Sequence, residues 1–278
     1  MLFGGYSMGF LETFSMSFWI LVGLALLISS IGFYKFVYFI SLGYGFSIAS
    51  FGIALVLLFW DSMNLVLLVM CGLFIVYGFR LGGYLALREW KNASYRQHMK
   101  SEINDGSTMP FFVKVMIWVS CAVLYVLEVS PVLFRLQNGG AVDLVAIIGT
   151  IIMALGILLE SMSDHQKSAA KKINPKRFCD TGLFRIVRCP NYLGEILFWT
   201  GVLVSGLTTL QGVWQWGAAI LGWVCIVYIM FGGARRLEIR QNKNYGHDPE
   251  YQAYVKSTPI ILPLVPLYSV EKYEFLKG

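Results

Sequence analysis

Apolar residues gather into seven long runs along this chain, separated by short polar or glycine-containing stretches such as DSM, QNGG and TTLQG. The runs lie near residues 14–33, 36–60, 63–85, 112–134, 141–162, 192–210 and 212–233. A helix needs about 20 apolar residues to cross the hydrocarbon layer, and lipid offers no partner to backbone amides, so each run predicts a transmembrane helix. The pattern therefore predicts an all-α, polytopic membrane protein with about seven transmembrane helices.

The basic residues alternate with these runs. If successive helices cross in opposite directions, all but Arg135 of the 22 lysines and arginines fall on one side. The positive-inside rule then puts the N-terminus outside and the C-terminus in the cytoplasm. We expect a single integral membrane domain over residues 1–278 that contacts membrane lipids, in a bacterial inner membrane or, in a eukaryote, the endoplasmic reticulum.

Composition supports the membrane class, because 57% of the residues are hydrophobic and only 14% are charged, against about 25% charged in soluble domains. The net charge of +6 does not indicate a nucleic-acid partner, since the basic residues lie in loops between apolar runs. The five cysteines form no C-x-x-C pair, so neither a disulfide framework nor a metal site is indicated.

Ionisable side chains within or beside membrane helices mark functional sites by default, because they are costly there. In YGFRLGGYLALREWK, the residues Tyr77, Arg80, Tyr84 and Arg88 share one helix face. Two arginines with two tyrosines suit a phosphate or a carboxylate. Arginines that reach the interface from a helix end would give the same pattern.

A second group lies in LLESMSDHQKSAAKK, where Glu160, Asp164, Lys167 and Lys171 again share one face. A solvated ladder of salt bridges would explain the lysines at the end of this stretch. It does not explain Glu160, which still lies within the apolar run.

The third group is GLFRIVRCPNYLGEILFWTG. Pro190 suits the first turn of a helix, and the basic residues Arg185 and Arg188 flank that helix start, which favours an anion. Asn191 and Glu195 are four residues apart and face the same way, as a carboxamide or ribose site would require. A capping asparagine and a glutamate paired with a nearby arginine remain an alternative.

All three groups lie on the predicted cytoplasmic side. Together they suit a large polyanionic ligand such as a phosphorylated dinucleotide. No G-x-G-x-x-G follows a strand, so this would not be a Rossmann site.

The segments RLGGYLALRE, ESMSDHQK, GLFRIVRCPNYLGEILFW and YQAYVKSTPIILPLVP resemble, in family order, the C-terminal domain of the steroid 5-alpha-reductases (3-oxo-5-alpha-steroid 4-dehydrogenases), in their bacterial membrane branch. They span most of residues 77–266, and NYLGE is the most specific. The resemblance implies a seven-helix membrane fold that binds NADPH on its cytoplasmic side. It also implies reduction of a carbon–carbon double bond conjugated to a ketone in a lipophilic substrate.

Carried over by position, the resemblance makes Tyr77 the catalytic residue that polarises the substrate carbonyl. The residues expected to bind NADPH are Arg80, Tyr84, Lys91, Glu160, Asp164, Lys171, Arg188, Asn191, Glu195 and Arg236. A C-terminal segment with Glu238 and Tyr254 is expected to cover the nucleotide.

The sequence departs from the family pattern at two places. Cys189 replaces the usual histidine before Pro190. The animal enzymes pair their tyrosine with a glutamate from an early helix, but the only acids among residues 1–76 are Glu12 and Asp61, both predicted on the outer side.

We therefore expect an NADPH-dependent oxidoreductase that acts on a CH–CH group. One alternative is an S-adenosylmethionine-dependent methyltransferase similar to the isoprenylcysteine carboxyl methyltransferases. In this chain RRLEIR followed by YGHDPEYQAYVKSTPIILP also fits the C-terminal pattern of those enzymes. Another is a non-enzymatic lipid-binding protein. The sequence fixes neither the substrate nor the oligomeric state, and it does not separate NADPH from NADH.

Overall fold

The structure is a computed structural model that describes residues 9–91 and 109–276, without the side chains of residues 88–91. Every regular element in these residues is a helix, which confirms the all-α prediction. The chain divides into two compact units. Unit 1 comprises Met1–Thr150 and Val202–Trp223, and unit 2 comprises Ile151–Gly201 and Val224–Gly278.

Within the described residues, six helical segments are long and apolar enough to cross a membrane: Met16–Phe33, Phe36–Leu58, Leu65–Leu87, Phe111–Gln137, Leu144–Ile173 and Gly212–Tyr245. Each corresponds to one of the seven predicted runs. The remaining run, at 192–210, forms α8 (Pro190–Gly206), which has 17 residues. Such a helix is about 25 Å long, whereas the hydrocarbon layer is about 30 Å thick. The described part thus has six candidate spans, and the count of seven and the orientation stay predictions.

Unit 1 holds the early helices. They are α1 (Phe10–Thr13), α2 (Met16–Ser29), η1 (Ser30–Phe33), η2 (Phe36–Phe39), α3 (Leu42–Leu58), η3 (Trp60–Ser62), α4 (Leu65–Lys91) and α6 (Phe111–Gln137). Unit 1 also includes the first residues of α7 (Leu144–Ile173) and α9 (Gly212–Tyr245) and the last residues of α8.

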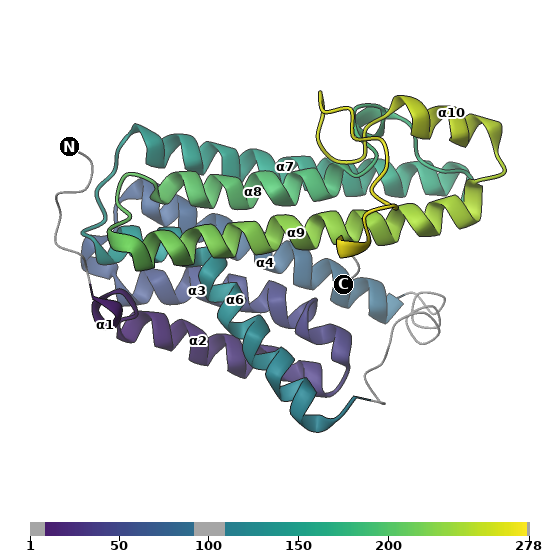
Figure 1. Ribbon diagram of the computed structural model, residues 1–278. Coiled ribbons are helices and arrows are strands. Elements are labelled where there is room, and N and C mark those ends of the chain that lie inside the picture. Colours follow the sequence, from purple (N-terminus) through teal and green to yellow (C-terminus); the bar gives the residue numbers. More distant parts are fainter. Residues whose placement is uncertain (1–8, 92–108, 277–278) are drawn as a thin grey trace. The chain divides into compact units, whose positions relative to one another are not determined.

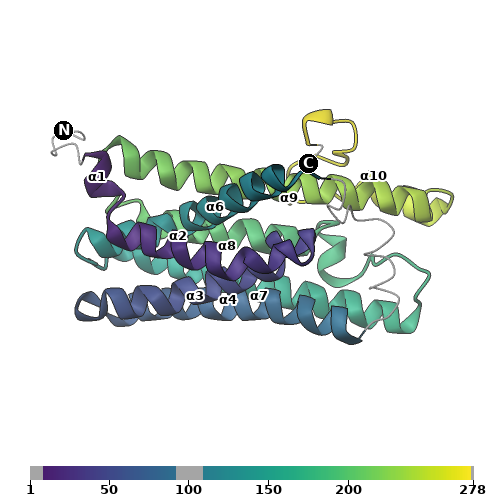
Figure 2. The same ribbon diagram turned by 90° about the horizontal axis from the view of Figure 1, so that it is seen from below.

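Helices α3 and α4 lie side by side and touch through their backbones (Figures 1 and 2). A methyl group added at Gly78 would overlap the carbonyl oxygen of Gly45 and lie 2.5 Å from the amide nitrogen of Ala49. A methyl group at Gly45 would lie 2.8 Å from the amide nitrogen of Gly82. Small residues allow this approach, so the glycines of run two pack the helices tightly.

Arg135, the exception to the charge pattern, is fully buried near the end of α6. Its Nε donates to the carbonyl of Ser205 at 2.6 Å, and its Nη2 donates to Thr208 Oγ1 at 2.6 Å. The guanidinium also contacts the carbonyl of Ala141 and pairs with Asp143 at 3.4 Å. Because each nitrogen of the guanidinium has a hydrogen-bond partner, the buried charge is satisfied.

Unit 2 contains most of α7, the start of α8 and the second part of α9, together with η4 (Gly182–Arg185), α10 (Pro249–Ser257) and η5 (Glu274–Leu276). The helix α7 has 30 residues and α9 has 34. Helices of that length are about 45 and 51 Å long, so each extends well beyond a hydrocarbon layer of about 30 Å. Their polar C-terminal ends carry the residues of the candidate site.

Glycines also bring α7 and α8 together in unit 2. A methyl group at Gly156 would lie 2.6 Å from the amide nitrogen of Phe198, and one at Gly194 would lie 2.5 Å from Cγ of Glu160. The side chain of Glu160 therefore lies directly against α8, at the residue before Glu195.

Candidate functional site

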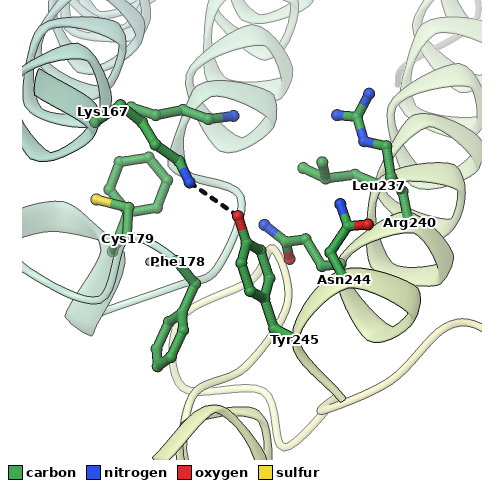
Figure 3. A pocket seen from close by; sticks show the side chains of 10 residues that line it. Lys167, Phe178, Cys179, Leu237, Arg240, Asn244 and Tyr245 are labelled. Atoms are coloured by element: carbon green, nitrogen blue, oxygen red, sulfur yellow. Dashed lines mark hydrogen bonds between the residues drawn. The ribbon is translucent and has the colours of Figure 1, made fainter. Parts of the chain in front are cut away.

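A cavity of about 110 Å³ lies in unit 2 between the C-terminal ends of α7 and α9 (Figure 3). On α9 its lining residues Leu237, Arg240, Gln241 and Asn244 recur at helical spacing, so they share one face. On α7 it is lined by Lys167 and Lys171, which are one turn apart. Both helices continue past their apolar segments, and in these extensions the lining residues recur on one face of each helix.

The cavity is electropositive. Three of its ten lining residues are cations, namely Lys167, Lys171 and Arg240, and none of the ten carries a carboxylate. Figure 3 shows Lys167 and Arg240 on opposite sides of the cavity, with Asn244 beside Tyr245 on α9. Such a lining suits a phosphate or another oxyanion.

Lys171 lines the cavity and also holds the segment after α7 and Tyr245 of α9 by hydrogen bonds. Its ammonium donates to the carbonyls of Pro175 (3.0 Å) and Arg177 (2.6 Å) and to the Tyr245 hydroxyl (2.9 Å). Figure 3 shows the bond to Tyr245 as a dashed line. Because an ammonium has three donors, these bonds use all of them, while its charge still faces the cavity.

Aromatic side chains join α10 to the cavity wall. The ring of Phe178 stacks on Tyr254 at 5.4 Å between centroids, and it meets Tyr251 edge-on at 5.2 Å. The Tyr254 hydroxyl donates to the carbonyl of Phe184 at 2.6 Å. Burial raises the pKa of Tyr251 to about 12 and also raises the pKa of Tyr254. Both phenols therefore stay neutral at physiological pH and serve as hydrogen-bond donors and packing groups.

Arg188, predicted to attract a nucleotide, is buried just before α8 and pairs with Glu238 of α9 at 2.8 Å. Its Nη2 also contacts the carbonyl of Tyr268. Within the described residues, its Nε and Nη1 are buried and find no hydrogen-bond partner. Glu238 neutralises the charge of Arg188. Through its contact with Tyr268, Arg188 holds the C-terminal segment in this structure.

Cys189, at the position where the resemblance leads to the expectation of a histidine, is buried. Burial raises the pKa of its thiol to about 12, against the opposing charges of Arg188 and Lys167. A thiol with such a pKa is neither a nucleophile nor an acid at neutral pH, so the position serves packing.

The helix start at Pro190 is confirmed, because α8 begins there. Asn191 is half-buried in its first turn, and Glu195 is buried and accepts a hydrogen bond from Trp199 Nε1 at 3.2 Å. Glu160 is buried against Gly194. The structure thus brings Glu160 and the NYLGE stretch to one buried contact between α7 and α8, and neither Glu160 nor Glu195 lines the cavity. A shared binding surface of these residues stays a prediction.

Two further predicted residues of unit 2 lie near this region along their helices. Asp164 is half-buried one turn after Glu160 on α7, and Arg236 is exposed one turn before Arg240 on α9. Arg236 was predicted from the sequence, whereas the cavity-lining residues Arg240, Gln241 and Asn244 were not. The helical spacing of these polar residues along α9 could have indicated that they share one face.

The remaining predicted residues belong to α4 of unit 1. Tyr77 is fully buried and its hydroxyl donates to that of Tyr44 at 3.1 Å. Arg80 is half-buried and Tyr84 is exposed. The side chain of Lys91 lies outside the described residues. A common site of these residues with those of unit 2 stays a prediction.

In comparisons with known proteins, residues 19–258 match the model of a family described as protein of unknown function (DUF1295). No curated protein and no solved structure matches the chain. The family match runs from α2 to the end of α10 and includes the whole cavity lining. By this match the chain belongs to the DUF1295 family.

Proposed function

We propose that this membrane protein is an NADPH-dependent oxidoreductase that reduces a carbon–carbon double bond conjugated to a ketone in a lipophilic substrate. The observation that carries the proposal is the cavity of unit 2, where three cations meet without a carboxylate in the lining. The resemblance to the steroid 5-alpha-reductases supplies the reaction class.

The lining fits the anionic part of such a cofactor. A cavity of about 110 Å³ is well below the roughly 300–1,000 Å³ of a typical ligand pocket. It therefore suits one phosphate group, with the remainder of the dinucleotide bound outside it. Hydrogen bonds to a charged group contribute about 1.5–3 kcal/mol each, so Lys167 and Arg240 together would bind a phosphate strongly.

The same charge argues against the methyltransferase alternative. S-adenosylmethionine carries a sulfonium and an ammonium against a single carboxylate, so its net charge is positive. A lining of three cations repels such a ligand and attracts a polyanion. The cavity therefore favours NADPH.

When bound, NADPH would supply the hydride that adds to the carbon beta to the ketone. The electrons of the double bond move toward the carbonyl oxygen, and the alpha carbon then takes a proton from water. Tyr77 would donate a hydrogen bond to that oxygen as negative charge develops. One well-placed donor of this kind contributes roughly 3–4 kcal/mol to the rate.

Thermal unfolding of the detergent-solubilised protein tests the proposal. A ligand that binds the folded state at about 100 times its Kd stabilises that state by about 2.7 kcal/mol. We expect NADPH to raise the Tm clearly, and S-adenosylmethionine and inorganic phosphate to raise it little. Oxidation of NADPH in the presence of an enone lipid would then exclude a non-enzymatic lipid-binding role. If NADPH raises the Tm no more than inorganic phosphate does, the proposal is wrong.

A further inference from the structure

Tyr77 has a hydroxyl partner in the neighbouring helix. Its phenol donates to that of Tyr44 on α3 with an oxygen–oxygen distance of 3.1 Å, and the two rings meet edge-on at 6.2 Å between centroids. Tyr77 is fully buried and Tyr44 is only 7% exposed. The two hydroxyls therefore meet in an environment that excludes water.

The surrounding structure holds this pair in place. Tyr44 and Tyr77 are the chain neighbours of Gly45 and Gly78, the glycines through which α3 and α4 touch. On its other side, Tyr44 packs against the ring of Tyr125 at 5.0 Å between centroids. The Tyr125 hydroxyl is itself engaged by the carbonyl of Phe39, so Tyr125 supports the pair through its ring.

We propose that Tyr44 is a positioning residue for Tyr77 and takes the place of the early-helix glutamate that the sequence lacks. The inference rests on the proposed function. A lone tyrosine hydroxyl rotates about its C–O bond, whereas a hydrogen bond from or to a second phenol fixes its direction. In a dry interior, linked hydrogen bonds also polarise each other. In the protein alone the Tyr77 hydroxyl donates its single proton to Tyr44. When a substrate carbonyl becomes the acceptor instead, Tyr44 turns to donate to the Tyr77 oxygen, which fixes the direction of the Tyr77 hydroxyl and strengthens it as a donor.

A pair of phenols also suits its position in the membrane. A protonated phenol carries no charge, so the pair avoids the cost of burying a carboxylate in a transmembrane helix. Tyr77 donates a hydrogen bond to the developing oxyanion and Tyr44 donates one to Tyr77, so neither phenol has to give up its proton. The missing glutamate is therefore compatible with reductase chemistry on an enone.

A double-mutant cycle on the full-length protein tests this role, with kcat and KM measured for NADPH and an enone lipid. Tyr77→Phe should lower kcat by about 100-fold, the range seen for loss of an oxyanion donor. Tyr44→Phe should lower kcat by about 10-fold and leave KM for NADPH unchanged. The double variant should match Tyr77→Phe alone, because Tyr44 acts only through Tyr77.

Tyr125→Phe is the matched control. It removes a buried hydroxyl next to Tyr44 and its bond to Phe39, so it should lower the Tm and leave kcat unchanged. The shift in Tm caused by NADPH, measured in Tyr44→Phe, shows that this variant is folded. The inference is overturned if Tyr44→Phe keeps the wild-type kcat, or if the losses of the two single variants multiply in the double variant. If instead the wild-type protein fails to bind NADPH, the proposed function itself is wrong.

Discussion

Arg188 and Glu238 form a buried ion pair, with 2.8 Å between Nη2 and Oε1 and each side chain about 1% exposed. Glu238 also accepts hydrogen bonds from the backbone amides of Val270 (2.8 Å) and Glu271 (3.0 Å). The pair therefore joins the start of α8, the helix α9 and the C-terminal segment. Both residues were predicted to lie near a nucleotide, and that role stays a prediction. In this structure they hold the fold of unit 2.

Arg188→Met should destabilise the protein strongly, because it leaves Glu238 buried without its cation. Removing one partner of a buried pair costs about 3–5 kcal/mol, which should lower the Tm by several degrees. The double variant with Glu238→Leu should regain part of that loss, since no unpaired charge remains. Arg185→Met, an exposed neighbour, serves as the control and should unfold like wild type. A wild-type Tm for Arg188→Met would contradict the role of the pair.

The cationic lining of the cavity predicts how substitutions there change the affinity for NADPH. Arg240→Ala and Lys167→Ala should each weaken NADPH binding by about 10- to 100-fold, because each loses a hydrogen bond to a charged group worth roughly 1.5–3 kcal/mol. Titration calorimetry or the shift in Tm would measure this, and the loss should shrink at high salt. Lys243→Ala is the matched control, since Lys243 is exposed on the same helix and is not part of the cavity lining. Equal losses in all three variants would indicate a general charge effect and not a site.

The helices could be predicted from the sequence because each apolar run is long enough to require one. The run at 141–162 became a helix that continues to Ile173, and the run at 212–233 became one that continues to Tyr245. Hydropathy could not predict these extensions, because they are polar. They build the cavity wall, so Arg240 and Asn244 were missed while Lys171 was found.

Contacts between residues far apart in the sequence could not be predicted, for a different reason. The charge pattern marked Arg135 as an exception but could not show that Asp143 and Thr208 surround it. Likewise, Tyr77 was predicted from its motif, whereas its partner Tyr44 lies 33 residues away and was not. That partner follows from where two helices cross, and a single sequence does not give the crossing point.

The contact between α3 and α4 predicts opposite effects at two glycines of one helix. Gly78→Ala would overlap the backbone of α3 and should destabilise the protein by about 1–3 kcal/mol, as overpacking does. It should also lower kcat, because Tyr77 moves with it. Gly72→Ala is the control, since nothing lies within 4 Å of a methyl group there, and it should stabilise the protein by up to about 1 kcal/mol, because alanine favours a helix over glycine. Chemical or thermal unfolding of both variants measures the difference, and equal stability would contradict the close contact.

The acid stability of the protein should depend on Asp143. Burial alone would raise the pKa of its carboxyl, but hydrogen bonds from Thr208 and the Ala146 amide and the charge of Arg135 together hold that pKa below its ordinary value. An unfolded aspartate has a pKa of about 3.9, so the stabilisation is fully present above that pH and is lost as the pH falls through the lower, folded pKa. Asp143→Asn should therefore unfold at a lower Tm than wild type at pH 7, and the difference between the two proteins should shrink as the pH falls below about 4. Asp248→Asn, which changes a cap of α10 in unit 2, is the control and leaves the partners of Arg135 intact. A constant gap between the Tm values of wild type and Asp143→Asn across this range would show that the carboxylate charge contributes nothing to holding Arg135.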